Sequence, residues 1–251
     1  MILNIHELHK AYGTKKVLNG LSYQFVEGKI YSIIGRNGAG KTTFFNCINR
    51  DISFEQGTIT LIDGTKEREL TFEEVGMVSA SPILPEFLTG YEFINYFLSF
   101  NDGFSNSNEQ IVNDYFNLFR IQENDRFKLI KDYSYGMKNK LQLLCCLIRN
   151  PKVILLDEPL SSFDIIVSHD IKERLVELKH DHIILMSTHI LQLATDVSDE
   201  IILLKNGTLT SFDWKGYLRE DYEKHLIDVL NEEEWDAQPS GLFKGHVDHE
   251  C

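Results

Sequence analysis

One run of nine residues restricts the fold of this chain more than any other feature. Residues 35–43 read GRNGAGKTT and fit the pattern G-x-x-x-x-G-K-[ST] without a mismatch. The apolar residues 29–34 before it predict a buried strand, and residues 43–50 after it predict a helix. A strand, this loop and a helix in that order predict a phosphate-binding loop in an α/β fold. The alternative is an ordinary glycine-rich turn before a helix.

The residue types of the loop indicate its chemistry. Glycines let the main chain fold tightly, so that successive N–H groups point at a polyphosphate. The following helix adds the positive end of its dipole. We expect Lys41 to reach the β- and γ-phosphates and the Thr42 hydroxyl to bind Mg²⁺. The nucleotide-binding residues predicted in this loop are Gly35, Asn37, Gly38, Ala39, Gly40, Lys41, Thr42 and Thr43.

Composition argues against several other classes of protein. Most of the net charge of −13 lies in residues 220–251, and no part of the chain has the basic character of a nucleic-acid binder. No apolar run approaches the roughly 18 residues that span a bilayer, and the start of the chain lacks the pattern of a signal peptide. The cysteines show no metal-binding spacing, so we expect reduced thiols in a cytosolic protein.

The first third of the chain is expected to be rich in strands. Residues 2–9 and 17–26 predict two antiparallel strands joined by a hairpin loop at 11–16. Further strands are expected at 57–63 and 75–79. Together with the parallel strand–loop–helix unit, they predict a mixed sheet.

The rest of the chain predicts a helical insertion in an α/β core. Residues 90–150 have helical spacing, and the segment after residue 150 alternates between strands and helices. We therefore expect a P-loop NTPase core with a mixed sheet, an N-terminal antiparallel β subdomain and a helical subdomain inserted at about 82–150. This cassette would span 1–215. The acidic extension at 216–251 is most simply a solvated surface, with a short amphipathic helix near residues 226–230 as an alternative docking element.

Two acids follow the most apolar strand of the chain. The segment VILLDEP ends in Asp157 and Glu158, and ligands of open α/β sheets sit at the carboxyl ends of strands. Asp157 is placed to hold the Mg²⁺ shell opposite Thr42, and Glu158 to accept a proton from a water aligned on the γ-phosphate. Alone, such a pair would be as consistent with a solvated turn. The phosphate-binding loop favours the catalytic interpretation.

A histidine follows the next predicted strand. The segment HIILMSTH ends in His189, which a strand adjacent to VILLD would bring near the same γ-phosphate. A single histidine at a strand end is otherwise more often structural.

The order of these motifs resembles a known family. The segments GRNGAGKTT, YSYGMKNKLQ, VILLDEP, SSFD and STH resemble, across roughly residues 1–215, the ATP-binding subunit of bacterial ABC transporters, and in particular small exporter-type cassettes. The resemblance implies ATP and Mg²⁺ as cofactors. It also implies a second ATPase subunit, more often identical than different, and a separate transmembrane permease subunit that would hold the chain at the cytoplasmic face of the membrane.

The resemblance assigns further residues. Tyr12 matches the hairpin aromatic that stacks on adenine, although it is otherwise an ordinary surface aromatic. Ser134 and Gly136 match the signature residues that bind the γ-phosphate held by the opposite subunit, and Asp164 matches the loop that crosses between subunits.

The chain departs from the family pattern in two places. Tyr133 and Tyr135 replace the leucine and the first glycine of the signature, and Met137 replaces its glutamine. Ala80 stands where the family has a glutamine on the loop that enters the helical insertion. Alanine neither binds Mg²⁺ nor orients water, so we expect weak metal coupling or slow basal hydrolysis.

The functional hypothesis is an ATP-hydrolysing motor subunit, with export of peptide or amphipathic antimicrobial substrates as the implied transport. The aromatic residues of segment 82–100 belong either to the core or to a groove for the membrane subunit. Two alternatives stay open. One is a nucleotide-binding regulator with weak hydrolysis, and the other is a non-transport ATPase of the same superfamily.

Overall fold

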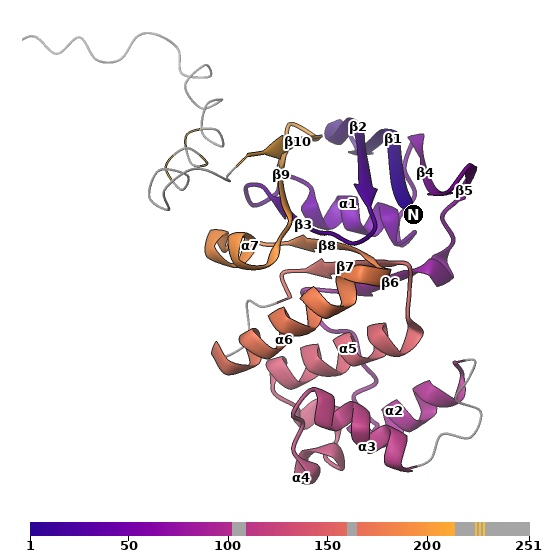
Figure 1. Ribbon diagram of the computed structural model, residues 1–251, viewed down its shortest axis with the longest axis vertical. Coiled ribbons are helices and arrows are strands. Elements are labelled where there is room, and N and C mark those ends of the chain that lie inside the picture. The colour runs from indigo at the N-terminus through magenta and orange to yellow at the C-terminus, as the bar shows by residue number, and fades with distance from the viewer. Residues whose placement is uncertain (102–108, 160–164, 214–223, 225, 227, 229–251) are drawn as a thin grey trace, which may run out of the picture. The chain divides into compact units, whose positions relative to one another are not determined.

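The structure is a computed structural model that describes residues 1–101, 109–159, 165–213, 224, 226 and 228 (Figure 1). The chain divides into two compact units, Met1–Asp213 and Trp214–Cys251. The description below concerns the first unit. Asp164 and most of the acidic extension lie outside the described residues, so the domain limits and the extension stay predictions.

The N-terminal unit begins with an antiparallel sheet in the order β2-β1-β4-β5. Its strands are β1 (Ile2–Tyr12), β2 (Lys15–Val26), β4 (Gln56–Asp63) and β5 (Lys66–Glu69). The hairpin turn is tighter than the sequence predicted, because only Gly13 and Thr14 separate β1 from β2, and Gly13 takes the left-handed φ of 61° that the turn requires. Tyr12 is therefore the last residue of a strand rather than a loop residue.

The main sheet has the order β10-β9-β3-β8-β7-β6 and is parallel except for β10. Its strands are β3 (Ile30–Ile34), β6 (Val75–Val78), β7 (Val153–Asp157), β8 (Ile183–Ser187), β9 (Glu200–Lys205) and β10 (Thr208–Phe212). Every residue of β3, β7 and β8 is buried, as expected for central strands covered on both faces. These two sheets confirm the predicted mixed α/β fold class.

The two faces of the main sheet carry separate cores. In β7, Val153 and Leu155 pack with the antiparallel sheet and α1 (Lys41–Ile48), whereas Ile154 and Leu156 pack with the helices on the opposite face. Helix α1 lies between the two sheets (Figure 1), and both of its phenylalanines, Phe44 and Phe45, are fully buried. Burying one such side chain stabilises the fold by roughly 1.5–3 kcal/mol. The helix that follows the phosphate-binding loop is therefore firmly held.

The inserted helices lie between β6 and β7 in the chain and pack on the second face. They are α2 (Gly90–Ser99), α3 (Glu109–Leu118), α4 (Glu123–Arg126) and α5 (Tyr135–Arg149). Helices α6 (Ile165–Leu178) and α7 (Leu191–Val197) follow β7 and β8, and short 3₁₀ turns occur at Phe72–Glu74, Ile130–Asp132 and Lys179–Asp181. Leu141, Leu144 and Leu175 join this core.

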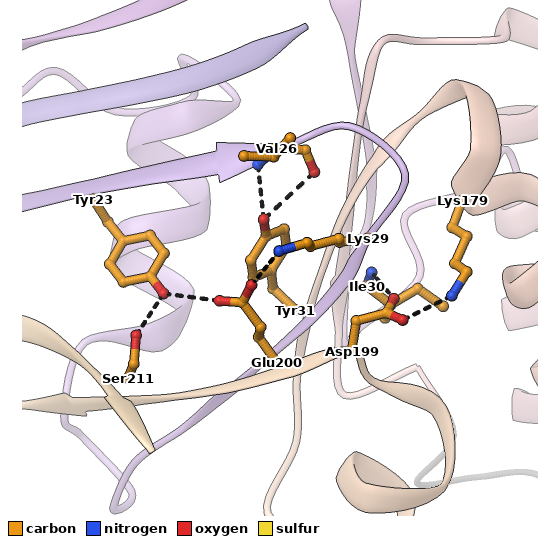
Figure 2. Close-up of polar contacts among 9 residues, drawn as sticks. All are labelled: Tyr23, Val26, Lys29, Ile30, Tyr31, Lys179, Asp199, Glu200 and Ser211. Carbon is orange, nitrogen blue, oxygen red and sulfur yellow. Dashed lines mark hydrogen bonds and ion pairs between the residues drawn. The ribbon is translucent and has the colours of Figure 1, made fainter. Parts of the chain in front are cut away.

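A polar cluster fastens the two sheets at the amino ends of β3 and β9 (Figure 2). The Lys29 Nζ lies 2.6 Å from Glu200 Oε1, and the Tyr23 hydroxyl donates to Glu200 Oε2 at 3.2 Å. The Tyr31 hydroxyl accepts from the Val26 N–H at 2.8 Å. Burial raises the pKa of both tyrosines, and the hydrogen bond to Glu200 raises the pKa of Lys29. This cluster lies at the ends of the strands opposite the phosphate-binding loop.

The first residue of α2 is a glycine because a buried tyrosine lies against it. A Cβ added to Gly90 would lie 1.9 Å from the Tyr133 hydroxyl, which is buried and donates to the Asp125 carbonyl at 2.9 Å. The tyrosine in place of the signature leucine is therefore accommodated inside the helical segment, and it ties the residue before Ser134 to the start of α2.

We predict that Gly90→Ala destabilises the protein although alanine is the better helix former. The propensity gain is up to about 1 kcal/mol, whereas the displaced Tyr133 ring costs about 1–3 kcal/mol. Chemical denaturation should therefore give a net loss of stability. In a Tyr133→Leu background the same glycine substitution should be neutral or stabilising, and equal losses in both backgrounds would contradict this packing argument.

Candidate nucleotide site

The predicted loop opens onto a cavity of about 400 Å³. The phosphate-binding loop and the two strand-end acids meet at this cavity. Lys41 and Thr42 face it from α1, and Asp157 and Glu158 face it from the end of β7. The residues that line it are Tyr12, Lys15, Val17, Asn37, Gly38, Gly40, Lys41, Thr42, Thr43, Ala80, Asp157 and Glu158. The structure thus brings together most of the site residues that the sequence predicted.

Two glycines explain the shape of the loop. Gly40 has a φ of 107°, and a Cβ there would lie 2.7 Å from the Val17 side chain on β2. Gly35 leaves no room for a side chain either, because an added Cβ would lie 2.6 Å from the Leu204 carbonyl oxygen on β9. The loop is therefore pressed between the two sheets, and its main chain follows a path that larger residues would block.

Lys41 is buried and bonded to its own loop. The residue is 8% exposed, and its Nζ donates to the Gly35 carbonyl at 2.7 Å. Burial lowers the pKa of Lys41, and the charges of Glu158 and Asp157 oppose that shift. The cation is thus held at the base of the loop and faces two carboxylates.

The side chains of the two strand-end acids contact different residues. Asp157 is buried, and its Oδ2 accepts from the Thr42 hydroxyl at 2.8 Å. Glu158 has a left-handed φ of 51°, and its Oε2 lies 2.9 Å from His189 Nδ1. His189 itself is exposed and is not among the lining residues, so it approaches the site from outside through Glu158.

The donors present fit Mg²⁺. The Thr42 hydroxyl and the Asp157 carboxylate are hard oxygen ligands that meet at hydrogen-bonding distance. In the part of the chain that the structure describes, no cluster of three His, Cys, Asp or Glu residues forms a complete metal site. A cation here would accordingly take its other ligands from water and from phosphate oxygens, as Mg²⁺ commonly does.

The signature residues do not reach this cavity. Ser134 is the exposed N-cap of α5, where its Oγ accepts from the Met137 N–H at 3.2 Å, and Gly136 is half-buried in the first turn. Tyr135 between them is exposed. Neither Ser134 nor Gly136 lines the cavity of its own chain, and Asp164 lies outside the described residues.

Several residues near the site escaped the sequence prediction. Lys15 and Val17 line the cavity from β2, and Ser187 Oγ donates to Asp157 Oδ1 at 2.5 Å. Gln142 of α5 satisfies both of its amide atoms when the amide oxygen faces the Ser79 N–H. The oxygen then accepts from that N–H at 3.0 Å, and the amide nitrogen donates to the Ser79 carbonyl at 3.3 Å. The only advance signal was for Ser187, which is the one polar residue of an otherwise apolar strand.

Comparison with known proteins gives the relatives of this chain. Residues 18–161 match the family model described as ABC transporter. The chain is 30% identical over 213 residues to the bacitracin transport ATP-binding protein BcrA of Enterococcus faecalis, covering 83% of this chain and 68% of that protein. It is 32% identical over 230 residues to the phosphate import ATP-binding protein PstB 2 of Lactobacillus johnsonii, covering 84% and 89%.

The fold has a similar solved structure. A dimeric ATP-binding cassette in a post-hydrolysis state, bound to ADP and phosphate, has a TM-score of 0.74 at 22% identity, with 86% of this chain and 100% of that chain covered. Among the helices of the described residues, none has both the length and the apolar character to cross a bilayer.

We predict that Ala80→Gln accelerates ATP turnover, because Ala80 lines the cavity yet offers neither a ligand nor a hydrogen bond to water. A gain of about tenfold, which corresponds to about 1.4 kcal/mol of barrier, should accompany a lower Mg²⁺ concentration for half-maximal rate. The matched control is Ser81→Gln, since Ser81 is exposed and does not line the cavity. Unchanged turnover in Ala80→Gln, or an equal gain in both variants, would contradict the prediction.

Proposed function

Because this chain belongs to the ABC transporter family, we propose that it is the motor subunit of a transport complex and that the cavity beside the phosphate-binding loop is its ATP site. The chain is an ATP-binding cassette ATPase. The observation that carries the assignment of the site is the convergence of the loop, Thr42 and the Asp157–Glu158 pair on one cavity.

The residues predicted from the sequence have separate roles in this proposal. The main-chain N–H groups of the loop and Lys41 hold the β- and γ-phosphates, and Tyr12 at the rim stacks on the adenine. Thr42 and Asp157 would hold Mg²⁺, which when bound would neutralise phosphate charge. Glu158 accepts a hydrogen bond from the attacking water and takes its proton, while His189 holds the Glu158 carboxylate from outside the cavity.

A second cassette completes the site in this proposal. The supporting observation is the exposure of Ser134 at the N-terminus of the long helix α5, away from the cavity of its own chain. Exposed N–H groups at a helix N-terminus favour phosphate. Two copies arranged head to tail would each place Ser134 and Gly136 over the nucleotide of the other, and the similar solved structure bound to ADP and phosphate is dimeric. Asp164 would belong to the same contact.

A membrane subunit is the proposed partner of the helical segment. The aromatic residues expected there divide into two groups. One group is partly buried and packs against the core, namely Tyr91, Phe93 and Phe97, and the other is exposed, namely Phe87, Tyr96 and Phe100. Ile83, Phe87 and Phe100 are 89%, 79% and 70% exposed. Large apolar side chains exposed to this degree favour a contact with another protein. Such a contact would hold the chain at the cytoplasmic face of the membrane.

Export of a peptide is the favoured transport reaction. The similarity to a bacitracin transport protein supports it, and the similarity to a phosphate import protein supports import as the second candidate. A regulator with weak hydrolysis is a further candidate, which the alanine at position 80 favours. Substantial ATP turnover by the purified chain would decide against the regulator, and very slow turnover would favour it.

We predict that Glu158→Gln abolishes turnover but retains ATP binding, because the amide cannot accept the proton of the attacking water. Loss of a general base lowers the rate by roughly 10²–10⁴-fold. Steady-state ATPase assays measure the rate, and size-exclusion chromatography with Mg-ATP should detect a stable dimer. Glu123→Gln, an exposed change on α4, is the matched control. Normal turnover in Glu158→Gln would remove Glu158 from its proposed role.

We predict that Phe87→Ser combined with Phe100→Ser uncouples the chain from its membrane subunit without changing basal ATPase activity. The removed surface is apolar and lies outside the cavity. The test identifies the integral membrane protein that co-purifies with the tagged chain, reconstitutes it in vesicles and measures its stimulation of ATP turnover. Phe72→Ser is the control, because Phe72 is exposed but lies outside the helical segment. Undiminished stimulation of the double variant would contradict the docking surface.

A further inference from the structure

One buried hydroxyl contacts both strand-end acids of the site. Ser187 is the last residue of β8 and stands directly opposite Asp157 in the β7–β8 register. It is fully buried. Its Oγ lies 2.5 Å from Asp157 Oδ1 and 3.1 Å from the Glu158 main-chain nitrogen.

The direction of both hydrogen bonds follows from the groups involved. An ionised carboxylate only accepts and a main-chain N–H only donates, whereas a serine hydroxyl has one proton and two lone pairs. The Ser187 hydroxyl therefore donates its single proton to Asp157 and accepts from Glu158. No other assignment satisfies both contacts, so the hydroxyl gives its only proton to Asp157 and one of its lone pairs to the Glu158 N–H.

The bond to the main chain acts at an unusual backbone conformation. Glu158 has a φ of 51°, a left-handed value that non-glycine residues adopt rarely and that the surroundings must hold in place. The Glu158 N–H is shared between Ser187 Oγ and the Ser187 carbonyl, which lies at 3.2 Å. His189 fixes the other end of the residue at Oε2. Glu158 is thus located at its backbone by Ser187 and at its carboxylate by His189.

The bond to the side chain fixes the rotation of a carboxylate. Ser187 engages Oδ1 of Asp157, and Thr42 engages Oδ2 at 2.8 Å. Because Ser187 of β8 holds Oδ1, Oδ2 is turned toward the Thr42 hydroxyl. Oδ2 and the Thr42 hydroxyl oxygen are the two oxygens that fit Mg²⁺.

We propose that Ser187 is a positioning residue for ATP hydrolysis, whose hydroxyl orients the Asp157 carboxylate and holds Glu158 in its left-handed conformation. This inference rests on the roles proposed above for Asp157 and Glu158. Ser187 touches neither nucleotide nor water in this scheme. It acts through the two acids.

The chain offers a control serine in the same sheet. Ser32 lies in β3, is fully buried, and its Oγ is 2.5 Å from Ser198 Oγ. Among the described side chains, the hydrogen-bond partner of Ser32 is Ser198 and neither Asp157 nor Glu158. Removal of the Ser32 hydroxyl therefore measures how much a buried serine of this sheet contributes to stability without any effect on the two acids.

The kinetic test compares Ser187→Thr with Ser187→Val, because these side chains have the same shape and differ only in the hydroxyl. Valine should lower kcat by about 10–100-fold and raise the Mg²⁺ concentration for half-maximal rate, as loss of a supporting partner does. Threonine should restore most of the rate. The KM for ATP should change by less than about threefold, since phosphate binding is retained. Ser187→Ala decides the outcome if the added methyl group unfolds both variants.

A second measurement needs no nucleotide. Hydrogen exchange of the Glu158 amide, followed by NMR, should accelerate by about tenfold or more in Ser187→Val and Ser187→Ala, and remain near the wild-type rate in Ser187→Thr and Ser32→Ala. Unchanged exchange at Glu158, or equal kinetic losses in Ser187→Val and Ser32→Ala, would overturn the inference. Normal turnover in Glu158→Gln would instead overturn the proposed function, and the amide exchange would still decide whether Ser187 holds this backbone.

Discussion

The site depends on the order of three buried strands in one parallel sheet. β8 lies between β3 and β7, so the end of β3 brings the phosphate-binding loop to one side of Ser187 and the end of β7 brings Asp157 to the other. Because parallel strands share one carboxyl edge, residues far apart in the sequence meet there without long loops. Thr42 and Asp157, 115 residues apart, are joined by a single hydrogen bond across this edge.

Much of this arrangement could be predicted from the sequence. The continuous apolar runs of β3, β7 and β8 indicate buried parallel strands, and the loop motif fixes where the phosphates would lie. By contrast, β5 was missed, because its four charged and exposed residues, KERE, show no alternation of apolar and polar residues. Residues such as Lys15 and Val17 could not be assigned either, since their place at the cavity depends on how two sheets pack.

The departures from the family pattern have different structural consequences. Tyr133 is absorbed by the core, where Gly90 makes room for its ring and Asp125 accepts from its hydroxyl. Tyr135 is exposed beside Ser134 and so belongs to the surface that a second copy would meet. Ala80 removes a side chain from the cavity itself. Sequence could locate these three changes, but only packing separates the one inside the core from the two that face solvent or the cavity.

The helical segment connects the two surfaces on which the proposed function depends. Residues 86–90 and 128–131 form a short ladder, with the Ile130 N–H bonded to the Leu88 carbonyl at 2.8 Å and the Lys131 N–H bonded to the Glu86 carbonyl at 3.2 Å. The Glu86 carboxylate also pairs with Lys138 of α5 at 2.7 Å. The exposed Phe87 and the exposed Ser134 are therefore carried by one hydrogen-bonded piece of the fold. A membrane subunit bound at the first and a second cassette bound at the second would hold the same hydrogen-bonded element, so movement of one contact would be passed to the other through these bonds.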